Sequence, residues 1–199
     1  MVKVCVGIPT SEETKFKFTL SLAKLCAYRS DRYLLTDLVY GQGCYVHENR
    51  NKIVNRFKDA DWLLQLDTDI VFETTLIDDL LRLAEDTNSK IVAGWYMNIV
   101  QNKYVPLVYK KKDNDYVFIL PQGDKPISVD IVGTGCLMVY KEVFEKIKKD
   151  TASPWFYFDE LNNKVVGEDF VFCQNARKAG YDIFIDPKLR VKHLKLGEV

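Results

Sequence analysis

Several features that mark other classes of protein are scarce or missing in the sequence. It contains no apolar run close to the roughly 18 residues of a membrane-spanning helix, no Cys-x-x-Cys pair and only two histidines. Gly and Pro contribute only 10 and 6 of the 199 residues, while 47% are hydrophobic, which excludes a disordered or fibrous class. Because 28 Lys and Arg residues balance 28 Asp and Glu residues, the sequence argues against nucleic acid or an anionic membrane surface as the main partner.

The cysteines do not follow a disulfide or zinc-binding pattern. There are five of them, an odd number, and they lie far apart in the chain: Cys5, Cys26, Cys44, Cys136 and Cys173. This spacing favours a reducing compartment. The N-terminus is strand-like rather than a signal peptide, so we expect a cytoplasmic protein without a membrane span.

The first half of the chain alternates strand patterns with helical patterns. The predicted strands cover residues 2–8, 34–40, 62–66 and 90–96, and the predicted helices cover residues 16–27, 47–60 and 75–85. Such an alternation is typical of a parallel sheet covered by helices.

The second half changes character. Short strands at residues 105–109, 116–120 and 127–131 are separated by polar turns, which indicates antiparallel or mixed pairing. A strand over residues 136–140, helices over 141–149 and 167–179, and strands over 183–186 and 189–193 complete the pattern. Gly180 follows the last helix, where a left-handed residue is favoured. We expect one α/β sandwich domain over residues 1–199, with a nucleotide-binding half up to about residue 100.

Asp67 and Asp69 follow directly on the apolar strand at residues 62–66. In open α/β sheets, ligands bind beyond the carboxyl ends of the parallel strands. Two ionised carboxylates there repel each other unless a cation lies between them, and oxygen ligands suit Mg²⁺ or Mn²⁺ bridging to a diphosphate. The alternative is a solvated loop in which one Asp caps the following turn. The other Asp-x-Asp pairs, at positions 59–61 and 113–115, precede a strand or lie in a hairpin turn.

Four further candidates accompany this pair. Glu168 and Asp169 open a helix, either for electrostatic reasons alone or as a general base aimed into the cleft. His193, at the end of the last strand, is a metal ligand only if other ligands converge on it. The glycine-rich turn at residues 133–135 serves tight backbone geometry or lines a site. Arg50 lies on a solvated helix face or reaches a phosphate.

A phosphatase is an alternative interpretation of the Asp67 segment. Residues 67–71 resemble the D-x-D-x-[TV] nucleophile motif of haloacid-dehalogenase-type phosphatases. That family places the motif on its opening strand and holds Mg²⁺ with a later acidic pair. Here the motif follows the third strand, and residues 167–172 lack the later carboxylate at the required spacing.

Together these segments resemble the GT-A fold glycosyltransferases, in particular the family-2-like branch that includes the small glycosyltransferase domains of large algal viruses. The segments that carry the resemblance occur in the family's order: residues 3–10, Arg50-Asn51, residues 62–69, residues 133–139 and residues 167–169. The resemblance spans the chain from the first strand to His193. It implies a Rossmann-like α/β/α sandwich of GT-A type, with a mostly parallel central sheet and a small antiparallel C-terminal portion.

The resemblance also implies a role for each matched residue. The nucleotide would be held by Ile8, Pro9, Thr10, Arg50, Asp67 and Thr68. Mn²⁺ or Mg²⁺ would be held by Asp67, Asp69 and His193. The pocket for the sugar would be lined by Trp95, Gly133, Thr134, Gly135 and Glu168. Asp169 would be the catalytic base of an inverting enzyme, with Glu168 beside it.

The expected activity is transfer of a sugar from a nucleoside-diphosphate sugar, with uridine as the expected base, to a hydroxyl of a glycan or glycoprotein. Residues 101–199 would form the half that binds sugar and acceptor. A non-catalytic nucleotide-sugar-binding domain is the alternative from another class. Unlike larger members of the family, the chain carries no acceptor domain, so we expect further domains of a longer chain among its partners. A viral protein of this kind would act in the host cytoplasm.

Overall fold

The computed structural model describes residues 1–100, 102–113, 115–151, 154–161 and 164–194. Its centre is a seven-stranded sheet. The strands, in spatial order, are β10 (Ile127–Val129), β15 (Ile183–Arg190), β5 (Ile91–Trp95), β12 (Cys136–Tyr140), β3 (Trp62–Leu66), β1 (Val2–Thr10) and β2 (Tyr33–Gln42). All but β12 and β10 run in the same direction, so the predicted mostly parallel sheet is confirmed.

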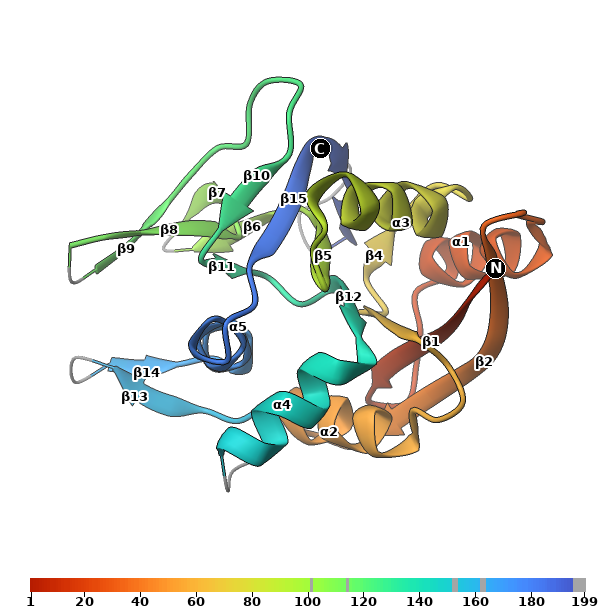
Figure 1. Ribbon diagram of the computed structural model, residues 1–199, viewed down its shortest axis with the longest axis horizontal. Helices are drawn as coiled ribbons and strands as arrows, with labels where there is room; N and C mark the ends of the chain where they lie inside the picture. The colour runs from red at the N-terminus through yellow and green to blue at the C-terminus, as the bar shows by residue number, and fades with distance from the viewer. Residues whose placement is uncertain (101, 114, 152–153, 162–163, 195–199) are drawn as a thin grey trace.

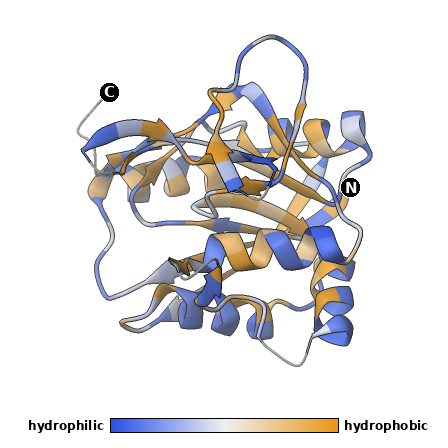
Figure 2. Ribbon diagram, turned by 90° about the vertical axis from the view of Figure 1, so that its left-hand side faces the viewer, coloured by the Kyte–Doolittle hydropathy of each residue, from blue (hydrophilic) through white to orange (hydrophobic). Residues whose placement is uncertain are grey.

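Helices cover both faces of the sheet. α1 (Phe16–Ala27) and α3 (Leu76–Thr87) lie on one face, and α2 (Val46–Arg56), α4 (Lys141–Asp150) and α5 (Glu168–Lys178) lie on the other, as Figure 1 shows. Because successive strand residues point to opposite faces, Val4 and Val6 pack towards α1 and α3, while Cys5 packs towards α2. Figure 2 shows the apolar residues concentrated on the inner strands and the hydrophilic ones along the outer helix faces.

Most predicted elements are confirmed within a few residues, and the helix after residue 46 is shorter than predicted. It ends at Arg56 because Phe57, Lys58 and Asp59 turn away, with Asp59 at a φ of 55°. Gly180 has a φ of 93°, which confirms the predicted left-handed residue after α5. In the described part of the chain, no helix is both long and apolar enough to cross a membrane.

Small antiparallel pairings were missed or merged in the sequence pattern. Residues 105–109 belong to two strands, β7 (Lys103–Pro106), which pairs with β6 (Met97–Val100), and β8 (Val108–Lys112). β8 pairs with β9 (Asp115–Phe118) and β11 (Ile131–Val132). The two remaining pairs are β13 (Asp159–Leu161) with β14 (Lys164–Val166), and β4 (Ile70–Val71) with β16 (Lys192–His193). The central sheet is therefore accompanied by small antiparallel sheets, which begin at β6 in the middle of the chain and continue into the C-terminal portion.

Candidate active site

The two aspartates lie where the sequence predicts, in the loop beyond the carboxyl end of β3. β3 is buried along its whole length, and the loop is held by Asp67 N, which donates to Gly135 O at 2.9 Å, and by Ile70 N, which donates to Asp67 O at 3.1 Å. The main chain therefore turns sharply between Asp67 and Asp69. Asp69 is only 9% exposed.

The short pairing of β4 with β16 brings His193 to Asp69 from the far end of the chain. His193 pairs with Ile70, and Leu194 N donates to Asp69 O at 2.8 Å. As a result His193 Nε2 lies 3.3 Å from Asp69 Oδ2, and both side chains are almost buried. The sequence suggests His193 as a candidate, but only this two-residue strand explains why it meets Asp69.

Arg50 joins the aspartate loop to the acidic pair of α5. Its guanidinium donates to Asp67 Oδ1 at 2.7 Å and to Gln65 Oε1 at 3.2 Å, and its Nε lies 3.5 Å from Glu168 Oε1. Arg50 is 1% exposed, so burial alone would lower its pKa, but the charges of Asp67 and Glu168 outweigh burial and raise it. A permanently charged guanidinium thus lies between two carboxylates in the interior.

The predicted phosphate contact of Arg50 stays a prediction. Its two carboxylate partners favour a positioning role, in which the side chain fixes Asp67 relative to Glu168. Gln65 and Asn49 are functional candidates that the sequence interpretation missed. A glutamine within the apolar run of β3 was the available signal for Gln65, which is fully buried.

Glu168 and Asp169 occupy the first turn of α5. Asp169 Oδ1 accepts a hydrogen bond from Phe170 N at 2.8 Å. Burial raises the pKa of Asp169 to about 6, helped by the charge of Glu168 and opposed by that hydrogen bond and by Arg50. A carboxylate with a pKa near the working pH is suited to accept a proton in a reaction.

Tyr96, rather than Trp95, lies against the glycine-rich turn. Gly135 N donates to Tyr96 Oη at 3.1 Å, and the Tyr96 ring lies 5.1 Å from that of His193. Trp95 is buried in the core on the opposite face, and its indole N–H donates to Pro187 O at 3.0 Å. Adjacent residues at the end of a strand point to opposite faces, which explains why the aromatic expected beside the turn is one position later. Thr134, between the two glycines, is buried.

Gly135→Ala tests how closely this turn approaches the aspartate loop. A Cβ at position 135 would lie 2.8 Å from Tyr96 Oη and 3.0 Å from Asp67 Oδ2. We expect a loss of about 1–3 kcal/mol in the free energy of unfolding, measured by urea denaturation. Tyr96→Phe removes the Oη, so the double variant should lose less than the sum of the single variants. Strict additivity would contradict the close contact.

A cavity of about 310 Å³ opens beside the aspartate loop. Its walls are formed by the end of β1, the start of α2 and the loop after β3, through Pro9, Thr10, Ser11, Gly43, Cys44, Val46, Asn49, Asp67, Thr68 and Asp69. Thr10 Oγ1 and Asn49 Oδ1 are buried there without a hydrogen-bond partner among the described residues. Unpaired polar atoms in a concave site are the groups that a polar ligand can satisfy. Of the predicted nucleotide residues, Ile8 and Arg50 do not line this cavity.

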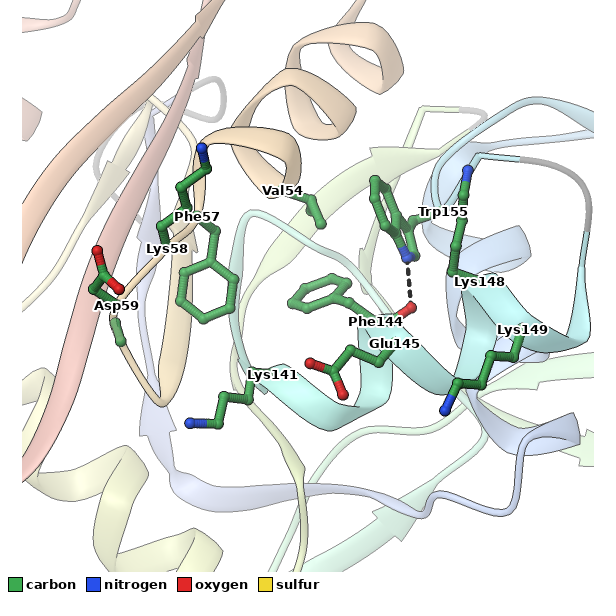
Figure 3. Close-up of a pocket in the computed structure, with 11 residues that line it drawn as sticks. Val54, Phe57, Lys58, Asp59, Lys141, Phe144, Glu145, Lys148, Lys149 and Trp155 are labelled. Atoms are coloured by element: carbon green, nitrogen blue, oxygen red, sulfur yellow. Dashed lines mark hydrogen bonds between the residues drawn. The ribbon is translucent and has the colours of Figure 1, made fainter.

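A larger cavity, of about 680 Å³, lies at the other end of α2 (Figure 3). Figure 3 shows Phe57, Phe144 and Trp155 around an apolar interior, with lysines such as Lys141 and Lys149 at its edge. None of its lining residues belongs to the aspartate loop or to the start of α5. The aspartate loop therefore borders the smaller cavity, while the charged side chains that line the larger one, such as Lys58, Asp59 and Glu145, come from other parts of the chain.

Comparison with known proteins shows which known fold this chain resembles. No protein-family model and no curated protein matches the sequence. The solved structure of A197 from STIV aligns with 96% of this chain and 85% of its own, at a TM-score of 0.65 and 20% identity. GalNAc-T7, solved with UDP, GalNAc and Mn²⁺, aligns with 96% of this chain at a TM-score of 0.66 and 12% identity, over 44% of its own length.

The fold is GT-A-like. The chain spans less than half of the length of the GalNAc-T7 chain. The likeness extends to a viral protein from STIV, and the algal-virus branch of the sequence resemblance stays a prediction.

The site residues of this GT-A-like fold can hold a divalent cation only if a bound ligand supplies further coordinating atoms. The described residues contain no group of three or more His, Cys, Asp and Glu side chains placed to hold a metal ion. Asp69 and His193 face each other, while one oxygen of Asp67 is bound by Arg50. Mg²⁺ and ions like it are commonly bound through one or two protein ligands plus substrate phosphates and water. Two ligands from this chain and a diphosphate therefore make a consistent set.

Proposed function

We propose that this chain is a metal-dependent glycosyltransferase that moves a sugar from a nucleoside-diphosphate sugar, expected to be a UDP-sugar, to a hydroxyl of a glycan or glycoprotein. The observation that carries the proposal is the convergence of two groups of residues on one edge of a GT-A-like fold. Asp69 with His193 forms one group, and Arg50 links Asp67 to the Glu168–Asp169 pair. GalNAc-T7, which shares the fold, was solved with UDP and Mn²⁺, which supports the same donor class here.

Each part of the site has a task in this reaction. The cavity beside Pro9, Thr10 and Asn49 would hold the nucleotide. Asp69 and His193 would hold Mn²⁺ or Mg²⁺, which supplies positive charge to the diphosphate leaving group. The sugar would lie towards Gly133, Gly135 and Glu168, where a side chain at either glycine would meet Tyr96.

In the transfer step, Asp169 takes the proton of the acceptor hydroxyl. The Asp169 carboxylate accepts the proton of the acceptor hydroxyl while that oxygen bonds to the anomeric carbon of the sugar. The bond between the anomeric carbon and the phosphate oxygen breaks, and the nucleoside diphosphate leaves with the electron pair. Attack opposite to the leaving group inverts the configuration, which requires metal and base on opposite sides of the sugar. Asp69 follows β3 and Asp169 opens α5, so the proposed metal ligand and the proposed base come from different elements of the fold.

The pH dependence of transfer follows from Asp169. The carboxylate acts as a base only when ionised, and its pKa is raised to about 6. We therefore expect transfer to be fully active above about pH 7 and to fall roughly tenfold for each pH unit below 6. The measurement is kcat/KM between pH 4.5 and 8. A rate that stays constant down to pH 4.5 would contradict Asp169 as the base.

His193→Ala tests the metal ligands. We expect Mn²⁺ to bind at least roughly tenfold more weakly in the presence of UDP, while the fold persists because only the two-residue β16 is touched. Lys192→Ala, a neighbouring exposed position on β16, is the matched control. Isothermal titration of Mn²⁺ into the UDP-saturated proteins gives the affinities. Equal Mn²⁺ affinity of the wild type and His193→Ala would remove His193 from the metal site.

A transfer assay separates this function from a non-catalytic nucleotide-sugar binder. The protein is incubated with UDP-sugars, Mn²⁺ and simple glycosides, and released UDP is measured. A transferase releases UDP with at least one donor, in part by slow hydrolysis even without an acceptor. Donor binding without any UDP release would favour the binder.

A further inference from the structure

Three aromatic side chains form an exposed cluster at the start of α2. Tyr45, just before the helix, is 61% exposed, and Phe158, just before β13, is 50% exposed. The His47 ring lies between them, 5.8 Å from that of Tyr45 and 4.9 Å from that of Phe158, the latter edge-to-face at 79°. Tyr45, His47 and Phe158 are called the aromatic cluster below. Exposed apolar side chains gathered in one place mark a binding surface.

The segment that carries Phe158 is anchored to α2 and to α5 through Phe156, two residues earlier. Asn51 Nδ2 donates to Phe156 O at 2.7 Å, and Asn51 Oδ1 accepts from Phe156 N at 3.1 Å. Phe156 in turn stacks on Phe172 of α5, with ring centroids 4.7 Å apart. His47 and Asn51 are four residues apart, so they share one face of α2, and this face meets the segment that carries Phe158. The cluster is therefore held in place by α2 and α5 together.

Residues next to the cluster on α2 reach both parts of the candidate active site, the proposed nucleotide cavity and the acidic pair of α5. Val46, adjacent to Tyr45 and His47, lines the proposed nucleotide cavity. Arg50, adjacent to Asn51, reaches Glu168 at the start of α5. The first turns of α2 therefore reach both the donor cavity and Glu168, and the aromatic cluster lies at the start of the same helix.

We propose that the aromatic cluster is the stacking platform for the acceptor, with one pyranose ring of a neutral glycan lying on Phe158 and with Tyr45 available to a neighbouring part of the glycan. This inference rests on the proposed transferase function. A pyranose presents a face of C–H groups, which packs on the electron-rich face of an aromatic ring, and an edge of hydroxyls. Three exposed acidic residues follow the cluster residues directly in the sequence, Glu48 after His47 and Asp159 and Glu160 after Phe158, and their carboxylates can accept hydrogen bonds from those hydroxyls. Their charge disfavours an acidic ligand, which selects a neutral sugar.

Binding of simple glycosides tests the platform without requiring transfer. The probes are the methyl β-glycosides of glucose, galactose, mannose and N-acetylglucosamine at millimolar concentration, with UDP and Mg²⁺ present. Saturation-transfer NMR reports their binding, because stacking uses the C–H face that all pyranosides share. We expect Phe158→Ala to bind the glycosides about tenfold more weakly than the wild type, and we expect Tyr45→Ala to reduce the affinity by a smaller factor. Phe158→Trp should restore binding, and Tyr104→Ala, at an exposed tyrosine of β7, should leave it unchanged.

The outcomes separate this inference from the proposed function. Glycoside binding that is absent from the wild type, or unaffected by Phe158→Ala, overturns the platform. A wild-type dimer that Phe158→Ala dissociates in analytical ultracentrifugation also overturns it, because a second copy would then cover the cluster. The thermal shift with UDP and Mg²⁺ is measured on the same samples. Its absence from the wild type contradicts the proposed function, whereas a normal shift with unchanged glycoside binding contradicts only the platform.

Discussion

Asp169→Asn is expected to keep donor binding and lose transfer by about 10²–10⁴-fold in kcat. Asn has the size of Asp but cannot take the proton of the acceptor hydroxyl. The substitution also suits a first helical turn, so the fold should be retained. The assay compares kcat with the thermal shift caused by a UDP-sugar and Mn²⁺. The shift should equal that of the wild type.

Glu168→Gln is the matched variant on the neighbouring position. Glu168 pairs with Arg50, so its loss should affect the affinity for donor or the positioning of Asp67 more than the proton transfer. Transfer by Asp169→Asn at nearly the wild-type rate, together with a large loss in Glu168→Gln, would assign the base to Glu168 instead.

Arg50→Met is expected to lower the free energy of unfolding by about 3–5 kcal/mol. The substitution leaves Asp67 and Glu168 near each other without the buried cation between them, and breaking one side of a buried ion pair is strongly destabilising. For a domain of this size, the melting temperature should fall on the order of 10 °C. Urea denaturation and calorimetry measure the two quantities.

Arg56→Met on the same helix is the control for the loss of one arginine. Arg56 contacts the Tyr40 carbonyl and ring at the surface, so we expect a change within about 1 kcal/mol. Equal effects of the two substitutions would contradict the bridging role of Arg50. Arg50→Met, Asp67→Asn should recover part of the stability, because one of the two uncompensated charges is removed.

The sequence predicted the layers of the fold because long, regular patterns decide them. β3 and β5 are buried along their whole length and β1 along most of it, and α1 and α3 carry wide apolar faces, so local sequence and the final packing agree. The two-residue strands β4 and β16 have no pattern of their own. They form only because the ends of β3 and β15 bring them together.

The candidate site was predicted in part for the same reason. Asp67 and Asp69 were found because a buried strand points to them, and Asp169 because it opens a helix. Tyr96 was missed because the face to which a residue just past a strand end points depends on tertiary packing, here against Gly133 and Gly135. The buried position of Arg50 was also hidden, since its helix is mostly polar and gave no sign that this arginine points inward.

The most direct test of the metal-dependent donor site is the thermal shift produced by a panel of UDP-sugars in Mn²⁺ and in EDTA, for the wild type and for Asp69→Ala. A ligand that binds the native state at 100 times its dissociation constant stabilises it by about 2.7 kcal/mol. We expect a clear rise in melting temperature with at least one UDP-sugar in Mn²⁺, little or none in EDTA, and little or none for Asp69→Ala in either. Equal shifts in Mn²⁺ and EDTA, or a full shift in Asp69→Ala, would contradict a donor site that depends on a metal ion held by Asp69.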